Sequence, residues 1–137
     1  MVFESLCEEG EEWCADARTT GLDHYGKADA MCAFFVITYR DEKSAAAAYD
    51  GAWQRQNLAG LADRTPVRLG NTGGRQDAER GTQKPKGQRV SVQIQIGRAL
   101  LQINLETLPD ATPLSDGEVA ELAARFAERA RKAQGLR

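Results

Sequence analysis

Residues 89–106 predict a β-hairpin whose register can be read from the sequence. Apolar and polar side chains alternate on both sides of Gly97 and Arg98, and a glycine in a two-residue loop suits a tight hairpin turn. Folding the chain there opposes apolar residues on one face, as the pairs Val90–Leu105, Val92–Ile103 and Ile94–Leu101. The other face carries uncharged polar residues, namely Ser91, Gln93, Gln95, Gln102 and Asn104. A shift of one residue would exchange the faces, so the chain is committed to an antiparallel sheet with one apolar face.

The remaining pattern predicts an α+β domain. Residues 31–40 form a strand that is apolar on both faces, with residues 13–20 as its hairpin partner and turn formers at 21–27. Asp41 caps a helix, residues 65–69 form a short strand, and Ser115 with Glu118 opens a last helix through a capping box. The expected order is β-β-α-β-β-β-α, an antiparallel sheet of about four to five strands with two packed helices. A ferredoxin-like sheet that dimerises is the alternative.

Residues 70–88 are the one long stretch without a hydrophobic period. They hold several glycines among charged residues, and a loop of this length is usually functional or mobile. We expect this segment to be the most mobile part of the domain, because its glycines lose much entropy on ordering.

Size and charge narrow the class of protein. The 137 residues, 42% hydrophobic and 28% charged, are typical of one globular domain spanning 1–137. A net charge of -2 predicts no nucleic-acid partner, because nucleic-acid binding requires a basic surface. The longest apolar run, residues 31–37, is too short to span a bilayer.

No pattern in the sequence is typical of a catalytic or metal site. His24 is the only histidine, it has no partner at metal-ligand or dyad spacing, and it lies among turn formers, which indicates an exposed loop. We therefore expect no catalytic residues, no metal and no cofactor. The three cysteines lack CxxC spacing, so either one disulfide with a spare thiol or three thiols is possible. Pairing Cys14 with Cys32 would centre a hairpin near Asp23, and we predict that disulfide.

The best candidate for a binding site is the polar face of the hairpin and the aromatic residues near it. Neutral amides cost less to cover than charges do, although this face would also suit plain solvent exposure. Tyrosine and tryptophan carry an apolar ring and one polar atom each, although most such residues belong to a core. The predicted ligand-binding residues are Tyr39, Tyr49, Trp53, Gln93, Gln102 and Asn104.

The chain also resembles the secreted and lipid-anchored domains of actinobacteria, including small lipoproteins and the extracellular sensor domains of serine/threonine kinases. The resembling segments are residues 34–41 running into the alanine-rich helix to Trp53, residues 89–105, and residues 122–135. The resemblance implies export, a lipid anchor upstream as the sole membrane attachment, and a non-enzymatic binding or sensing role. Sensor domains of this kind usually carry paired disulfides, whereas this chain has an odd number of cysteines.

Two functions are therefore in view. The first is an exported, cell-surface binding or sensing domain that holds a small molecule or a protein partner against its sheet. The second is a cytoplasmic, ferredoxin-like α+β barrel enzyme or accessory protein that acts as a dimer.

Overall fold

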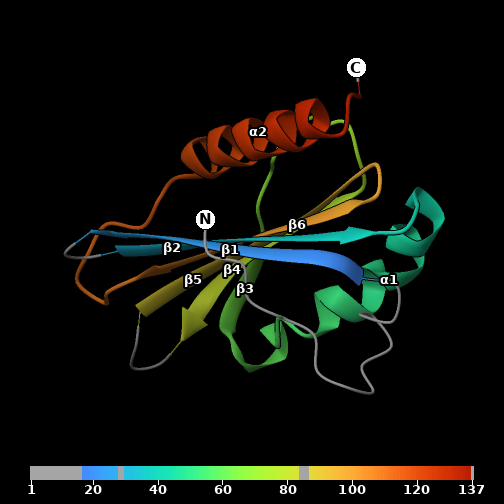
Figure 1. Ribbon diagram of the computed structural model, residues 1–137. Helices are drawn as coiled ribbons and strands as arrows, with labels where there is room; N and C mark the ends of the chain where they lie inside the picture. The colour runs from blue at the N-terminus through green and yellow to red at the C-terminus, as the bar shows by residue number, and fades with distance from the viewer. Residues whose placement is uncertain (1–16, 28–29, 84–86, 137) are drawn as a thin grey trace.

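The computed structural model describes residues 17–27, 30–83 and 87–136, with side chains from residue 31 onward. These residues form one six-stranded antiparallel sheet in the order β1-β2-β6-β5-β4-β3. The elements are β1 (Ala17–Lys27), β2 (Ala30–Tyr39), α1 (Glu42–Gln54), the short 3-10 helix η2 (Leu58–Gly60), β3 (Ala62–Pro66), β4 (Gln76–Gln83), β5 (Gly87–Ile96), β6 (Ala99–Thr107) and α2 (Asp116–Ala133). The two helices lie on opposite faces of the sheet (Figure 1). The α+β class and the antiparallel sheet are confirmed.

The hairpin of β5 and β6 has the predicted register. Val92 lies opposite Ile103 and Ile94 opposite Leu101, while Gln93 lies opposite Gln102 on the other face. Gly97 has a φ of 57°, the left-handed conformation that the tight turn requires.

The prediction of a loop over residues 70–88 was wrong for residues 76–83 and 87–88, which lie in strands, whereas residues 70–75 form no helix or strand. The mobility of that segment stays a prediction. Residues 76–83 form β4, which pairs along its whole length with β5. Its sequence lacks an apolar alternation, since only Ala78 and Gly81 are buried, so pairing with a neighbour overrides a weak local signal. Gly81 is needed for close packing, because a Cβ there would lie 2.7 Å from the Cβ of Leu61. The sheet therefore has one strand more than the largest number predicted.

The first hairpin was also placed wrongly. The predicted turn at 21–27 is part of β1, which continues to Lys27 opposite Ala30. His24 consequently lies in a strand opposite Ala33 and not in a loop. Residues 13–16 of the predicted strand lie outside the described residues. The turn formers misled the prediction because pairing with β2 holds Gly21 and Gly26 in extended backbone.

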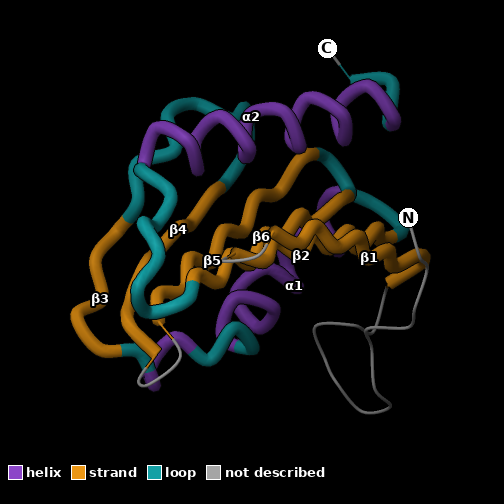
Figure 2. Tube along the Cα trace, turned by 90° about the vertical axis from the view of Figure 1, so that its left-hand side faces the viewer, coloured by secondary structure: helices purple, strands orange, loops and turns teal. Residues whose placement is uncertain are grey.

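Each face of the sheet has its own core. On the apolar face, α2 covers β5 and β6 with Val119, Ala123 and Ala127, and Phe126 meets Phe34 of β2 edge to face at 5.1 Å. On the opposite face, α1 covers a smaller cluster that includes Ile37, Tyr39, Tyr49 and Leu100. Figure 2 shows the sheet between the two helices. The ferredoxin-like alternative does not describe this chain, because the element order differs from β-α-β-β-α-β.

Both predicted helix starts are confirmed. The Asp41 carboxylate accepts a hydrogen bond from the Ser44 amide at 2.7 Å, and the Ser115 hydroxyl and Glu118 form a reciprocal capping box. The bond from the Ser44 amide is the main cause that lowers the pKa of Asp41 from its ordinary value of 3.8.

Because the pKa of Asp41 is lower in the folded protein, the cap stabilises the fold above the ordinary aspartate pKa, and this contribution is lost as the pH falls through the lowered value. We expect wild-type protein to lose more stability than Asp41→Asn on acidification, since asparagine caps without titrating. Urea midpoints of the two proteins measured from neutral pH to pH 2 test this. Parallel curves would show that Asp41 does not contribute.

Candidate functional site

The polar face of the β5–β6 hairpin packs against α1. Small buried residues line this side of the helix, namely Ala45, Ala48 and Ala52, so the helix backbone comes close to the sheet. Three side-chain amides, which we call the amide layer, donate to main-chain carbonyls of the helix: Gln93 to Tyr49 at 2.9 Å, Gln95 to Glu42 at 3.2 Å and Gln102 to Ala52 at 3.5 Å. The amide layer therefore holds α1 on the sheet.

Two members of the amide layer are also bonded to each other. The Gln102 amide donates to the Gln93 side-chain oxygen at 2.7 Å, and Gln93 is fully buried. Among the described residues, every buried side-chain nitrogen or oxygen has a hydrogen-bond partner. The amide layer thus offers no unsatisfied polar group to a ligand.

Tyr49 is the central side chain of this contact. It is fully buried, and its hydroxyl donates to the main-chain oxygen of Gln93 at 3.1 Å. The guanidinium carbon of Arg75 lies 4.0 Å from the centroid of the Tyr49 ring, and Arg75 also pairs with Asp50 at 2.5 Å. Burial raises the pKa of Tyr49 far above its ordinary value, and neighbouring Asp77 raises it further. Tyr49 is a neutral structural residue.

Tyr39 has a similar role at the end of β2. Its side chain is fully buried in the cluster under α1, and burial raises its pKa well above the ordinary value. Its main chain is bonded to the turn of the β5–β6 hairpin, because the Tyr39 amide donates to the Arg98 carbonyl at 2.8 Å. Tyr39 is therefore part of the core and not of an exposed site.

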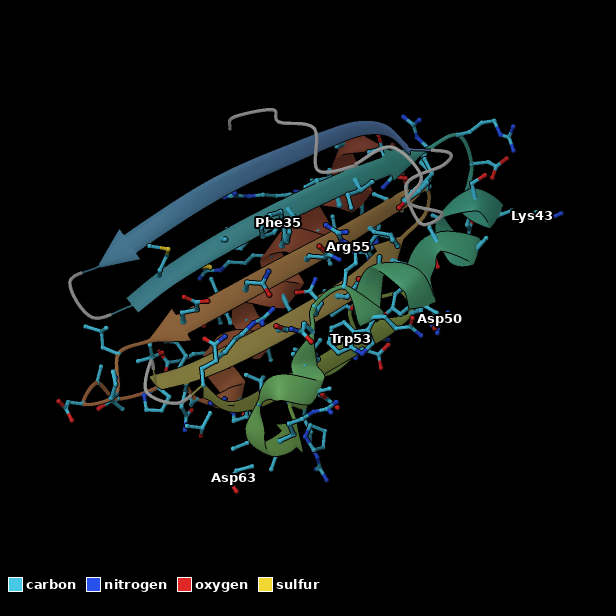
Figure 3. All side chains as sticks on the ribbon, turned by 90° about the horizontal axis from the view of Figure 1, so that it is seen from below. Phe35, Lys43, Asp50, Trp53, Arg55 and Asp63 are labelled. Carbon is cyan, nitrogen blue, oxygen red and sulfur yellow. The ribbon has the colours of Figure 1, made fainter. Side chains whose placement is uncertain are left out.

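Part of this face lies beside α1. The helix runs diagonally, with its first turn over Gln95 and its last turn near Gln102. The residues beside it form what we call the outer sheet surface: Met31, Ala33 and Phe35 of β2, Asn104 of β6, Arg89 of β5 and Trp53 of α1. Met31 is 52% exposed and the others are half-buried. Figure 3 shows Phe35 and Trp53 on the same side of the molecule, with Arg55 between them in this view.

The polar residues of the outer sheet surface are held in place by hydrogen bonds to neighbouring side chains. Asn104 accepts from the buried Ser91 hydroxyl at 3.0 Å, and Arg89 donates to Gln56 at 3.3 Å. Burial lowers the pKa of Arg89, while the nearby Glu106 acts in the opposite direction. These contacts fix an amide and a guanidinium on the same sheet face as two aromatic rings, and these groups suit a ligand with an aromatic or apolar part and an acceptor group.

The six predicted ligand-binding residues therefore separate into two groups. Tyr39, Tyr49, Gln93 and Gln102 are buried in the contact with α1, whereas Trp53 and Asn104 reach the outer sheet surface. Sequence reasoning did not select Met31, Phe35 or Arg89. The signal for Phe35 was present, since a strand that is apolar on both faces exposes one of them unless a helix covers its whole length.

The predicted Cys14–Cys32 disulfide is unsupported, because Cys32 forms no disulfide in the structure. Cys14 lies outside the described residues, and Cys32 is a free thiol that is half-buried on the side of α2. The register that suggested the pairing is not the observed one, because Cys32 lies opposite Tyr25. Burial raises the pKa of Cys32 to about 11, so this thiol is protonated and a weak nucleophile at neutral pH.

The described part of the chain contains neither a metal-binding cluster nor a membrane-spanning helix. No three His, Cys, Asp or Glu side chains gather there in a way that could hold a metal ion. None of its helices has the length and apolar character needed to cross a membrane.

Comparison with known proteins gives a likeness of fold. No protein-family model matches the chain, and no curated protein matches it. Among solved structures, the extracellular domain of PknH from Mycobacterium tuberculosis matches with a TM-score of 0.51 and 11% sequence identity, covering 91% of this chain and 73% of that chain. At this identity the likeness concerns the fold alone. It agrees with the predicted resemblance to extracellular sensor domains of actinobacterial kinases.

Proposed function

We propose that this protein is a non-enzymatic, exported binding or sensing domain that holds its ligand on the outer sheet surface. The observation that carries the proposal is that the sheet face on the side of α1 has two parts, the amide layer and the outer sheet surface. The amide layer under α1 is saturated by internal bonds, whereas the adjoining surface presents two aromatic rings, of Phe35 and Trp53, and two polar groups, of Asn104 and Arg89. The fold shared with an extracellular domain supports a location outside the cell. The proposed attachment, an upstream lipid anchor, rests on the resemblance to lipid-anchored domains alone.

The chemistry of the outer sheet surface favours a ligand of small size. The two aromatic rings supply apolar contact area, and the anchored amide and guanidinium supply directed donors to an acceptor or anion. A short segment of a protein partner with the same groups would use the same contacts. We place the small molecule first, because the aromatic side chains and the donors lie on the same face of the sheet, beside α1.

An aromatic anion tests this surface. We expect titration of 15N-labelled protein with 1-anilinonaphthalene-8-sulfonate to shift the backbone amides of Ala33, Phe35, Trp53 and Asn104 most strongly. Phe35→Thr removes one ring and introduces a β-branched residue that suits a strand, and it should weaken binding at least ~5-fold, since an aromatic contact contributes about 1 kcal/mol.

The matched control is Leu136→Ser, which removes another partly exposed apolar side chain, 44% exposed, beyond the end of α2. This variant should bind the probe as the wild type does. Unchanged binding by Phe35→Thr, or amide shifts concentrated along α2, would contradict the proposal.

A further inference from the structure

The two edges of the sheet are built differently. The edge strand β3 has five residues, contains Pro66 and a register irregularity, and places Asp63 at a φ of 53°. These features prevent a further strand from pairing with it. At the other edge, β1 has eleven residues and no proline. Its one register irregularity lies at its start, between Ala17 and Thr19, and it is in continuous register with β2 from Thr19 to Lys27. Among the described residues, no strand pairs with the outer edge of β1.

The hydrogen-bond pattern identifies the groups at this edge. The Tyr39 amide donates to Arg98 of the β5–β6 turn, so odd-numbered residues of β2 bond toward β6 and even-numbered ones toward β1. The even-numbered residues of β2 are paired with odd-numbered residues of β1, as in the pair Phe34–Asp23. The odd-numbered residues of β1 therefore bond to β2. The main-chain N–H and C=O groups of Thr20, Leu22 and His24 therefore point away from the sheet.

We propose that β1 pairs antiparallel with β1 of a second copy of this chain, joining the two sheets edge to edge across a two-fold axis at Leu22. A symmetric antiparallel ladder requires a residue to face its own copy, and Leu22 is the middle residue of the eleven. In this register Thr20 faces His24 of the second copy, and these are the positions whose main-chain groups are directed outward.

The charges of β1 agree with this register. Lys27 would face Ala17, Arg18 would face Gly26, and Asp23 would face Gly21, so no like charges are opposed. A copy of the same strand therefore fits along the regular part of the edge, from Thr19 to Tyr25, which excludes the irregularity between Ala17 and Thr19. This interface leaves the outer sheet surface of each copy free, so it is independent of the proposed ligand site.

Sedimentation velocity over a concentration series tests the proposal on the full chain. We expect the wild type to change from 15.0 kDa to twice that mass as its concentration rises. Thr20→Pro removes an outward N–H without removing a bond to β2, and it should weaken dimerisation at least ~10-fold, because a lost ladder bond and the bulk of the proline ring act together. The matched control Thr20→Val keeps the N–H and should dimerise as the wild type does.

Hydrogen exchange of the wild type provides a second readout that does not depend on the folding of a variant. The amides of Thr20, Leu22 and His24 should become protected as the dimer forms. A wild type that stays monomeric at its highest soluble concentration would overturn the proposal. Equal dimerisation of folded Thr20→Pro and Thr20→Val, or protection of these amides in the monomer, would also overturn it, the latter because the edge would be covered within one chain.

Discussion

Replacing Tyr49 with alanine should lower the free energy of unfolding by about 3–5 kcal/mol, the range typical of a fully buried aromatic residue in a core. Tyr49 is fully buried between α1 and the sheet, where its hydroxyl bonds to Gln93 and its ring faces Arg75. The truncation would leave a cavity under the helix and would remove the aromatic ring that the Arg75 guanidinium contacts. Urea unfolding followed by far-UV circular dichroism measures this loss.

Tyr49→Phe is the matched control for that experiment. It keeps the ring and its contact with Arg75 and removes only the hydroxyl, so it should cost about 1 kcal/mol, the usual contribution of one hydrogen bond. A Tyr49→Ala protein as stable as Tyr49→Phe would mean that the packing of α1 on the sheet contributes little, which contradicts the assignment of Tyr49 to the core.

Gln93→Ala should be the most damaging substitution in the amide layer, at about 2 kcal/mol, because it removes two bonds and leaves a buried donor without its best acceptor. Gln93 donates to the Tyr49 carbonyl at 2.9 Å and accepts from Gln102 at 2.7 Å. After its removal, the Gln102 amide keeps only the long contact of 3.5 Å to Ala52.

The control for Gln93→Ala is Gln54→Ala, since Gln54 lies on the exposed side of α1. That change should alter the free energy of unfolding by less than about 0.5 kcal/mol. If the two glutamine variants unfold at the same urea concentration, the amide layer does not hold the helix.

The parts of the fold that were predictable are those in which local pattern and burial agree. The register of the β5–β6 hairpin follows from its period of two and from Gly97, and both helix starts follow from capping residues. The strand β4 was missed because only one of its eight residues is an apolar residue in the core, Ala78. Its main chain is held by the ladder with β5, and its own side chains give no pattern that predicts this pairing.

The candidate site was predictable in part. The unusual run of neutral amides pointed to the face that α1 partly covers and on which we propose the ligand site, but a sequence cannot show how far a helix will cover that face. Gln93 and Gln102 proved to be partners of the α1 backbone, while Asn104 and Trp53 remained accessible beside it. The alanines of α1 are the residues that allow this close approach, and they could have indicated that the amides would meet a helix.

The division of the α1-side face into a structural layer and a binding surface is the central claim. One measurement tests it directly: unfolding free energy and affinity for 1-anilinonaphthalene-8-sulfonate, determined together for Gln93→Ala and Phe35→Thr. We predict that Gln93→Ala loses stability and keeps its affinity, whereas Phe35→Thr loses affinity and keeps more of its stability. Loss of probe binding in a folded Gln93→Ala protein, with unchanged binding in Phe35→Thr, would contradict the account.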